Sequence, residues 1–233
     1  MNGVQTLSAI ENRSTAVIIA DQLREGIVAG TFVSGDQINE AQLAERLQVS
    51  RGPVREALHR LVQEGLLEGR PNRGVFVKEV TRRDIAEVAE AREVIECAAA
   101  EVITAMDDEE RERIAGALIA ATEPMAEAVA TDDRDRLRRA DLAFHTQLVR
   151  SGENTRLLRA YTTLATEALI CMLHFGDSEP DDDLIASHVH IAELLRSGDM
   201  EAVHLALHEH LSIDELDLHS HDEETLRHGR VEG

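Results

Sequence analysis

Aromatic residues are scarce in this chain: they make up 2% of its 233 residues, with one tyrosine, no tryptophan and four phenylalanines. A hydrophobic core must therefore be built from aliphatic side chains, which suits helices better than sheets. Hydrophobic residues still account for 43% of the sequence, which is enough to build such a core. The composition therefore predicts a mainly α-helical globular protein, and the length fits one large domain or two modest ones.

Long apolar runs are also lacking, and cysteine is rare. No stretch of 18 apolar residues is present, so the sequence predicts no transmembrane helix and no membrane partner. The first residues contain no basic segment followed by an apolar block, so we expect no secretory signal. Cys97 and Cys171 lie far apart in the chain and are interpreted as reduced core thiols of a cytoplasmic protein.

Basic side chains are few relative to acidic ones, and the formal net charge is −21. Taken alone, this charge argues against nucleic acid as a partner. Residues 1–78, however, hold nine basic and nine acidic side chains, so the whole excess of negative charge lies in residues 79–233. Within residues 46–78 there are seven basic and three acidic side chains. A locally basic segment in an acidic chain indicates a nucleic-acid contact in that segment.

The first 80 residues show the order of elements that is typical of a winged helix-turn-helix. Asn39 and Ser50 can cap the second and third helices, and Gly30 and Gly65 can end the first and third. The predicted elements are helices at about 15–29, 39–47 and 51–64, then strands in 66–70 and 75–80 around a turn at 71–74.

From Thr81 onward no strand pattern appears, and six helical stretches follow with short connections. They are expected at about 81–106, 107–130, 132–150, 153–175, 181–197 and 199–216. Helices joined in this way predict a bundle. We therefore predict a DNA-binding domain over residues 1–80, an antiparallel bundle of six to seven helices over 81–216, and a flexible tail over 217–233.

The start of the third helix offers the clearest candidate DNA-reading residues. In a helix-turn-helix the second helix of the pair lies in the major groove, with its first turn nearest the bases. Arg51 and Arg55 share one helix face and could pair with guanine, while Ser50 could bond a phosphate. Residues in the preceding helix and at the hairpin tip could touch phosphate or the minor groove. The candidates are Arg46, Ser50, Arg51, Arg55, Arg73 and Gly74, and solvated surface positions are the alternative for the arginines.

Several motifs in residues 15–80 closely resemble the N-terminal domain of the GntR family of transcription regulators. They are GDQINE at 35–40, LAERL at 43–47, VSRGPVREAL at 49–58, EGLL at 64–67 and NRGVFV at 72–77. The resemblance implies a homodimer that binds a short inverted repeat of double-stranded operator DNA. Gly52 departs from the family, which usually has Thr or Ser there, and without that hydroxyl a phosphate contact is expected to be lost. Ala41 stands where some relatives have a basic residue, so operator preference is expected to differ in detail.

Asp141 and His145 stand four residues apart, which places them on one face of a helix, and His188 and His210 fall in the last two helices. Three imidazoles and one carboxylate suit Zn²⁺, Ni²⁺, Mn²⁺ or Fe²⁺ and would leave open positions for a ligand. The chain has eleven histidines, however. Spacing alone therefore leaves open that these four residues are unrelated.

Residues 81–216 resemble the FCD ligand-binding domain of the FadR subfamily of GntR regulators. The shared pattern is Asp141 with Phe144-His145, His188 with Ile191, Gly198-Asp199, and His210-Leu211. The resemblance implies that Asp141, His145, His188 and His210 are metal ligands. His204 and His208 do not match the family positions. They share a helix face and are interpreted as solvated residues, with a surface site as the alternative.

Arg92 is the candidate effector-binding residue. The resemblance implies that it faces the cavity and grips a carboxylate of the effector through two hydrogen bonds. A surface ion pair with Glu96, four residues later, is the alternative. Glu96 and Tyr161 are further candidate pocket residues, and Asn154 is expected to cap a helix. A bound metal together with Arg92 would favour a small organic or sugar acid, because a buried charged ligand needs opposing charge.

These features predict a ligand-responsive DNA-binding transcription regulator, expected to be a repressor and not an enzyme, that senses a small carboxylate at a metal-containing site. Three alternatives remain open. The chain could be a metal-dependent hydrolase, because a metal with an open position could activate water. It could be a constitutive DNA-binding protein with a structural metal. It could also be a regulator for which the metal itself is the signal.

Overall fold

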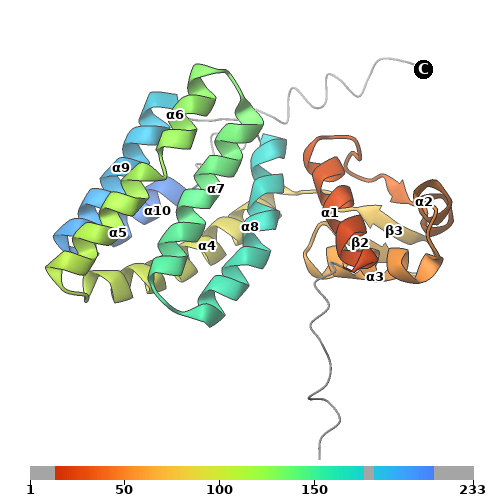
Figure 1. The fold of residues 1–233 in the computed structure, drawn as a ribbon, viewed down its shortest axis with the longest axis horizontal. Coiled ribbons are helices and arrows are strands. Elements are labelled where there is room, and N and C mark those ends of the chain that lie inside the picture. The colour runs from red at the N-terminus through yellow and green to blue at the C-terminus, as the bar shows by residue number, and fades with distance from the viewer. Residues whose placement is uncertain (1–13, 176–180, 213–233) are drawn as a thin grey trace, which may run out of the picture. The chain divides into compact units, whose positions relative to one another are not determined.

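The computed structural model describes residues 14–175 and 181–212, which are mainly helical (Figure 1). The chain divides into two compact units between Glu79 and Val80. The first contains a small sheet among three helices, and the second is helical throughout its described residues. This arrangement confirms the predicted fold class, a winged helix-turn-helix followed by a helical bundle.

The N-terminal unit is built around the contact of its first and third helices. Leu23 on the first helix and Leu58 and Leu61 on the third are buried, with at most 3% of their surface exposed. Asn39 caps the second helix, as predicted, because its Oδ1 accepts hydrogen bonds from the backbone N–H groups of Ala41 and Gln42. The elements are α1 (Thr15–Val28), β1 (Gln37–Ile38), α2 (Glu40–Leu47), α3 (Arg51–Gln63), β2 (Leu67–Arg70) and β3 (Gly74–Val77).

The wing is a three-stranded antiparallel sheet in the order β1-β3-β2. Its hairpin pairs Leu67 with Val77 and Arg70 with Gly74, in agreement with the predicted turn between two strands. Strand β1 was not predicted, because two residues are too short to show an alternating pattern. Its Ile38 lies opposite Val75 and is buried.

The C-terminal unit has seven helices within residues 80–175 and 181–212. Helix α4 packs against α7, α8 and α10, and α5 packs against α9. The core between them includes Phe144, Leu148, Tyr161 and Leu195, all fully buried. The helices are α4 (Arg82–Thr104), α5 (Asp108–Ala120), α6 (Glu123–Ala130), α7 (Arg134–Ser151), α8 (Thr155–Phe175), α9 (Asp181–Ser197) and α10 (Met200–Leu211).

The single helix predicted over 107–130 was wrong, since α5 ends at Ala120 and α6 begins at Glu123. Pro124 lies in the first turn of α6. A proline inside a continuous helix would lack an N–H donor and would clash with the carbonyl four residues earlier, here that of Ala120. Helix α10 ends at Leu211, and the predicted extension to residue 216, the break at 176–180 and the tail over 217–233 lie outside the described residues.

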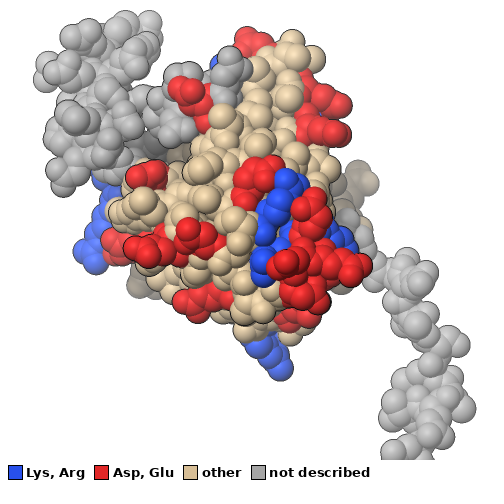
Figure 2. Space-filling view, turned by 90° about the vertical axis from the view of Figure 1, so that its left-hand side faces the viewer, with Lys and Arg blue, Asp and Glu red and all other residues tan. Residues whose placement is uncertain are grey.

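The surface of the C-terminal unit reflects its acidic composition. Acidic side chains are spread over much of the face in Figure 2, and basic side chains lie among them. Arg196, for example, pairs with Glu112 of α5 and with Glu193 on its own helix. Among the described residues, no helix is long and apolar enough to cross a membrane.

Candidate functional site

The six candidate DNA contacts are all exposed on the N-terminal unit. Ser50 occupies the N-cap position of α3, but its side chain makes no capping hydrogen bond, so the helix does not use its hydroxyl group. Arg55, one turn into α3, donates from Nε and Nη2 to Glu40 Oε2 at 3.3 and 3.0 Å. The start of α3 therefore exposes the side chains of Arg51 and Arg55, and Glu40 of α2 orients that of Arg55.

The tip of the wing has a backbone fixed by local contacts. Gly74 has φ +102° and Asn72 has φ +60°, both in the left-handed region. A Cβ atom at Gly74 would lie 3.0 Å from Gln37 Nε2, which itself donates to the Arg73 carbonyl at 2.7 Å. Strand β1 thus holds the turn in place, and the exposed Arg73 side chain extends from it. The positions of Arg46, Arg73 and Gly74 are compatible with DNA contacts, which stay a prediction.

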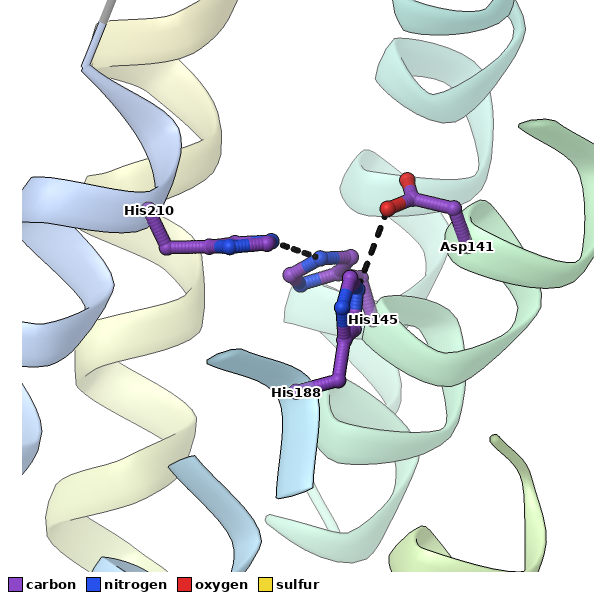
Figure 3. Close-up of side chains that lie close together, drawn as sticks. All are labelled: Asp141, His145, His188 and His210. Atoms are coloured by element: carbon purple, nitrogen blue, oxygen red, sulfur yellow. Dashed lines mark hydrogen bonds and ion pairs between the residues drawn. The ribbon is translucent and has the colours of Figure 1, made fainter. Parts of the chain in front are cut away.

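Four residues predicted as metal ligands converge inside the C-terminal unit (Figure 3). Asp141 and His145 come from α7, His188 from α9 and His210 from α10. One ligand atom from each residue lies within 4.8 Å of the others. The ring of Phe144 packs against the rings of His145 and His188 in T-shaped arrangements. Residues distant in the sequence are therefore brought together at one buried point.

The hydrogen bonds of the three histidines assign their protons. His145 Nδ1 lies 2.6 Å from the Glu96 carboxylate and His188 Nδ1 lies 2.7 Å from the Leu184 carbonyl, so both Nδ1 atoms donate. Ser187 Oγ donates to the Leu184 carbonyl and therefore accepts from His210 Nδ1 at 3.0 Å. With the proton on Nδ1 in each neutral ring, all three Nε2 atoms carry a lone pair toward the cluster.

A divalent cation fits the atoms at the centre of this cluster. The Nε2 atoms of His145 and His210 face each other at 3.0 Å, so two lone pairs meet with no proton between them. His188 Nε2 lies 3.0 Å from Asp141 Oδ1 but has no aligned hydrogen-bond partner, and Asp141 Oδ2 is buried without one. Buried polar atoms in proteins are normally paired. Three imidazole nitrogens and a carboxylate that lack proton donors match the donor set of a metal site, in which the second nitrogen of each histidine is held by an outer partner.

The pKa values of Asp141, His145 and His210 favour the same protonation states. Burial lowers the pKa of His145, and burial together with the two neighbouring histidines lowers the pKa of His210 well below its usual value. Burial opposes the charge on Asp141 and on His188. Their mutual attraction outweighs this effect, so the pKa of Asp141 is lowered and that of His188 is raised. Asp141 is therefore a carboxylate, and His145 and His210 are neutral.

Arg92 lies beside this cluster and is buried, with 6% of its surface exposed. Its Nε donates to Glu96 Oε1 at 3.3 Å and to the Tyr161 hydroxyl at 3.2 Å, and that hydroxyl donates to Glu96 Oε1 at 2.7 Å. The alternative ion pair with Glu96 is therefore present, but its predicted position at the surface was wrong, because both residues are buried. Arg92 Nη2 is buried without a hydrogen-bond partner. It can therefore donate to an added anion.

Glu96 joins Arg92 to the histidine cluster. Burial would raise the pKa of this carboxyl, but His145 and Arg92 lower it to about 2. Its Oε2 accepts from His145 while Oε1 accepts from Arg92 and Tyr161. When the three imidazoles are neutral, as metal ligands must be, Arg92 is the one cation beside the carboxylates of Glu96 and Asp141, which leaves one buried negative charge for a metal ion to offset.

The sequence indicated part of this site and missed the rest. Glu96 and Tyr161 were candidate pocket residues, and both line the network. Ser187, which holds His210, was not predicted, because a serine beside a histidine carries no pattern that separates it from other helical serines. Asn154 caps α8, as expected, since its Oδ1 accepts from the backbone of Arg156 and Leu157.

Comparison with known families agrees with both units. Residues 15–77 match the bacterial regulatory proteins of the gntR family, and residues 87–212 match the FCD domain. A winged helix-turn-helix followed by a helical domain with a buried polar cluster defines a DNA-binding transcription regulator with an effector-binding domain. The chain belongs to the GntR family and carries an FCD domain.

Its relatives are named as regulators. The chain is 31% identical to the Probable D-xylose utilization operon transcriptional repressor of Paenarthrobacter nicotinovorans, over 88% of this chain and 91% of that protein. It is 30% identical to the gluconate operon transcriptional repressor of Bacillus licheniformis, over 66% of this chain and 62% of that protein. A solved structure of a GntR transcriptional regulator from Rhodococcus sp. RHA1 matches with a TM-score of 0.71 and 28% identity, over 94% of this chain and 100% of that one. These names favour a regulator over the hydrolase alternative and give no support to the metal as signal.

Proposed function

We propose that this chain is a repressor that binds a short inverted repeat of double-stranded operator DNA as a homodimer, and that a small organic or sugar acid bound in its C-terminal unit changes this affinity. One observation carries the proposal. The unpartnered Arg92 Nη2 and the unpartnered ligand atoms of Asp141 and His188 belong to one buried network. A bound anion would accept a hydrogen bond from Arg92 Nη2, and a bound cation would be coordinated by Asp141 and His188.

Asp141, His145, His188 and His210 would hold one divalent ion, of the Zn²⁺, Ni²⁺, Mn²⁺ or Fe²⁺ class. When bound, the ion supplies positive charge and a coordination position for an anionic oxygen. The buried side chains carry a net charge of about −1, so an added dication reverses its sign to about +1. A carboxylate would restore neutrality. Arg92 Nη2 would donate to that carboxylate, and Glu96 and Tyr161 hold the guanidinium in position.

The class of effector follows from this charge and from the relatives. The names of two relatives refer to operons for D-xylose utilization and for gluconate. Gluconate is a sugar acid, and its carboxylate would suit the charge that Arg92 and a dication create. We therefore propose small sugar acids as the first compounds to test.

The N-terminal unit would read the operator through the first turn of α3. Arg51 and Arg55 would contact base edges in the major groove, and Ser50 a phosphate. Arg46 and the wing residues Arg73 and Gly74 would contact the backbone or the minor groove. Helix α4 carries Arg92 and Glu96 and follows the wing directly in the chain. A shift of α4 on anion binding would therefore be passed to the DNA-binding unit.

The test begins with the metal content of full-length protein without an affinity tag. We expect about one ion per chain by elemental analysis. The ion should be lost in His188→Ala and in His210→Ala but kept in His190→Ala, which changes an exposed histidine of the same α9 helix. Metal-free wild type would contradict the metal-dependent form of the proposal.

Operator affinity is then measured with gluconate and other small sugar acids. We expect at least one acid to change the affinity of the wild type and to have no effect on Arg92→Ala. If an acid binds the protein and operator affinity stays the same, the regulatory proposal is wrong.

A further inference from the structure

A second group of metal-ligating side chains lies on the surface of the C-terminal unit, apart from the buried cluster. His204 and His208 stand one turn apart on α10, with 62% and 59% of their side chains exposed. They meet Glu93 of α4, whose side chain is 23% exposed. His210, by contrast, turns inward from the same helix to the buried cluster. The outer group has no part in the proposed regulatory function.

The three side chains converge on a single carboxylate. His208 Nδ1 lies 3.0 Å from Glu93 Oε1 and 3.1 Å from Oε2, and His204 Nε2 lies 3.7 Å from Oε1. Ligand atoms bound tetrahedrally to zinc at about 2.0–2.1 Å lie roughly 3.3 Å from one another. The observed separations lie on both sides of this value. The exposed His204 ring would have to rotate toward Glu93 for its nitrogen to reach the distance of His208.

We propose that Glu93, His204 and His208 form a peripheral site for a divalent cation of the zinc class. Two imidazoles and a carboxylate are ligands that Zn²⁺, Ni²⁺ and Cu²⁺ accept, and the exposed side of the group leaves room for water as the remaining ligand. In the metal-free protein, His208 Nδ1 faces both oxygens of the Glu93 carboxylate. To bind a metal through Nδ1, the His208 ring would carry its proton on Nε2, on the solvent side, so that the Nδ1 lone pair is the ligand.

The site would join two helices that also supply the buried network. Helix α4 contributes Arg92 and Glu96 to that network, and α10 contributes His210. A cation shared by Glu93 and the two outer histidines would fix α10 against α4. A ligand that binds only the folded state stabilises it, so the cation should raise the melting temperature of the protein.

The experiment uses full-length protein in which the buried site is removed by Asp141→Ala and His188→Ala. The tail histidines His219, His221 and His228, which lie outside the described residues, are also replaced by alanine. Zn²⁺ is titrated in competition with a chromophoric chelator. We expect one equivalent to bind and the melting temperature to rise. Adding His204→Ala and His208→Ala should abolish both effects, and Glu93→Gln should weaken binding at least tenfold.

His190→Ala is the matched control, because it removes an exposed histidine of α9. It should leave the equivalent in place. If the protein with Asp141→Ala and His188→Ala does not fold, the same titration is made on protein with the buried site intact. That protein should bind two equivalents of Zn²⁺, and only one after His204→Ala and His208→Ala.

The peripheral site is overturned if that equivalent survives the loss of both His204 and His208, or if Zn²⁺ binds only at the buried site. Retention of the equivalent after Asp141→Ala and His188→Ala would support the peripheral site, whatever the fate of the regulatory proposal.

Discussion

Cys97 illustrates how the neighbours of a single residue set its chemistry. This thiol is half-buried in α4, and burial together with the nearby charges of Glu93 and Glu96 raises its pKa to about 11. The thiolate is the reactive form. Cys97 is therefore expected to stay unreactive over the physiological pH range, even though it is a free cysteine.

We expect the alkylation of Cys97 by iodoacetamide to be about 50-fold slower at pH 9 than that of a thiol with an ordinary pKa near 9, and to increase up to pH 11. The measurement is the alkylation rate against pH in a Cys171→Ser background, so that one thiol reports. Glu93→Gln should move the profile to lower pH. A rate at pH 9 equal to that of a free thiol would contradict the raised pKa.

Arg55 is the residue at which the proposed DNA contact is most directly testable. Loss of a bidentate contact to guanine costs about 1–3 kcal/mol and relaxes the preference at one base pair. Arg55→Ala should therefore weaken operator binding roughly 5- to 150-fold, measured at fixed salt by fluorescence anisotropy. Arg60→Ala, an exposed arginine in the last turn of the same helix, is the control and should have a much smaller effect. Equal losses in the two variants would argue for general electrostatic attraction.

The residues of the buried site could be predicted only in part. Asp141 and His145 share a helix, so their spacing alone predicts a common face. The Glu96–His145 and Glu96–Tyr161 contacts join residues 49 and 65 positions apart. Which side chains meet across such distances depends on how the helices pack, and helix periodicity contains no information about it.

Gly152 directly follows α7 and lies against Ala99 of α4. A Cβ atom at Gly152 would lie 2.9 Å from both Cα and Cβ of Ala99, because α4 passes directly against this position. Gly152→Ala should therefore destabilise the protein by about 1–3 kcal/mol in urea unfolding, since the backbone of α4 must shift. Gly116→Ala is the control, because a Cβ there meets nothing within 4 Å inside α5. It should stabilise the protein by about 0.4–1 kcal/mol. Destabilisation by both changes would show that the close approach is not the cause.

The elements were predicted best where they are long and periodic. The boundaries of α2 and α3 follow from Asn39 and Ser50 at their starts, and Gly65 follows α3 with φ +74°. The division of 107–130 into α5 and α6 could have been read from Pro124, but the apolar pattern continues across the break. Strand β1 has only two residues and exists because β3 offers it a free edge.

At the scale of the molecule, metal content and stability should be coupled. Removing a cation from the buried cluster would leave the facing lone pairs of His145 and His210 without an electrophile. Chelation should therefore lower the melting temperature, and Zn²⁺ should restore it, because a ligand of the folded state stabilises that state. The measurement is calorimetry before and after treatment with a chelator. No change in wild type, or the same change in His188→Ala combined with His210→Ala, would contradict a buried metal.

Glu96 contacts Arg92 through one carboxylate oxygen and His145 through the other. This double contact matters if the regulator is to be engineered as a biosensor for another compound. If Arg92 holds the effector as proposed, exchanging it would be the direct way to change which acid is recognised. The same exchange would also remove a cation from Glu96 and so change the hold of that carboxylate on the ring of His145. On the proposed site, the choice of effector and the choice of metal would therefore change together, so libraries that vary Arg92 should also vary Glu96 and Tyr161.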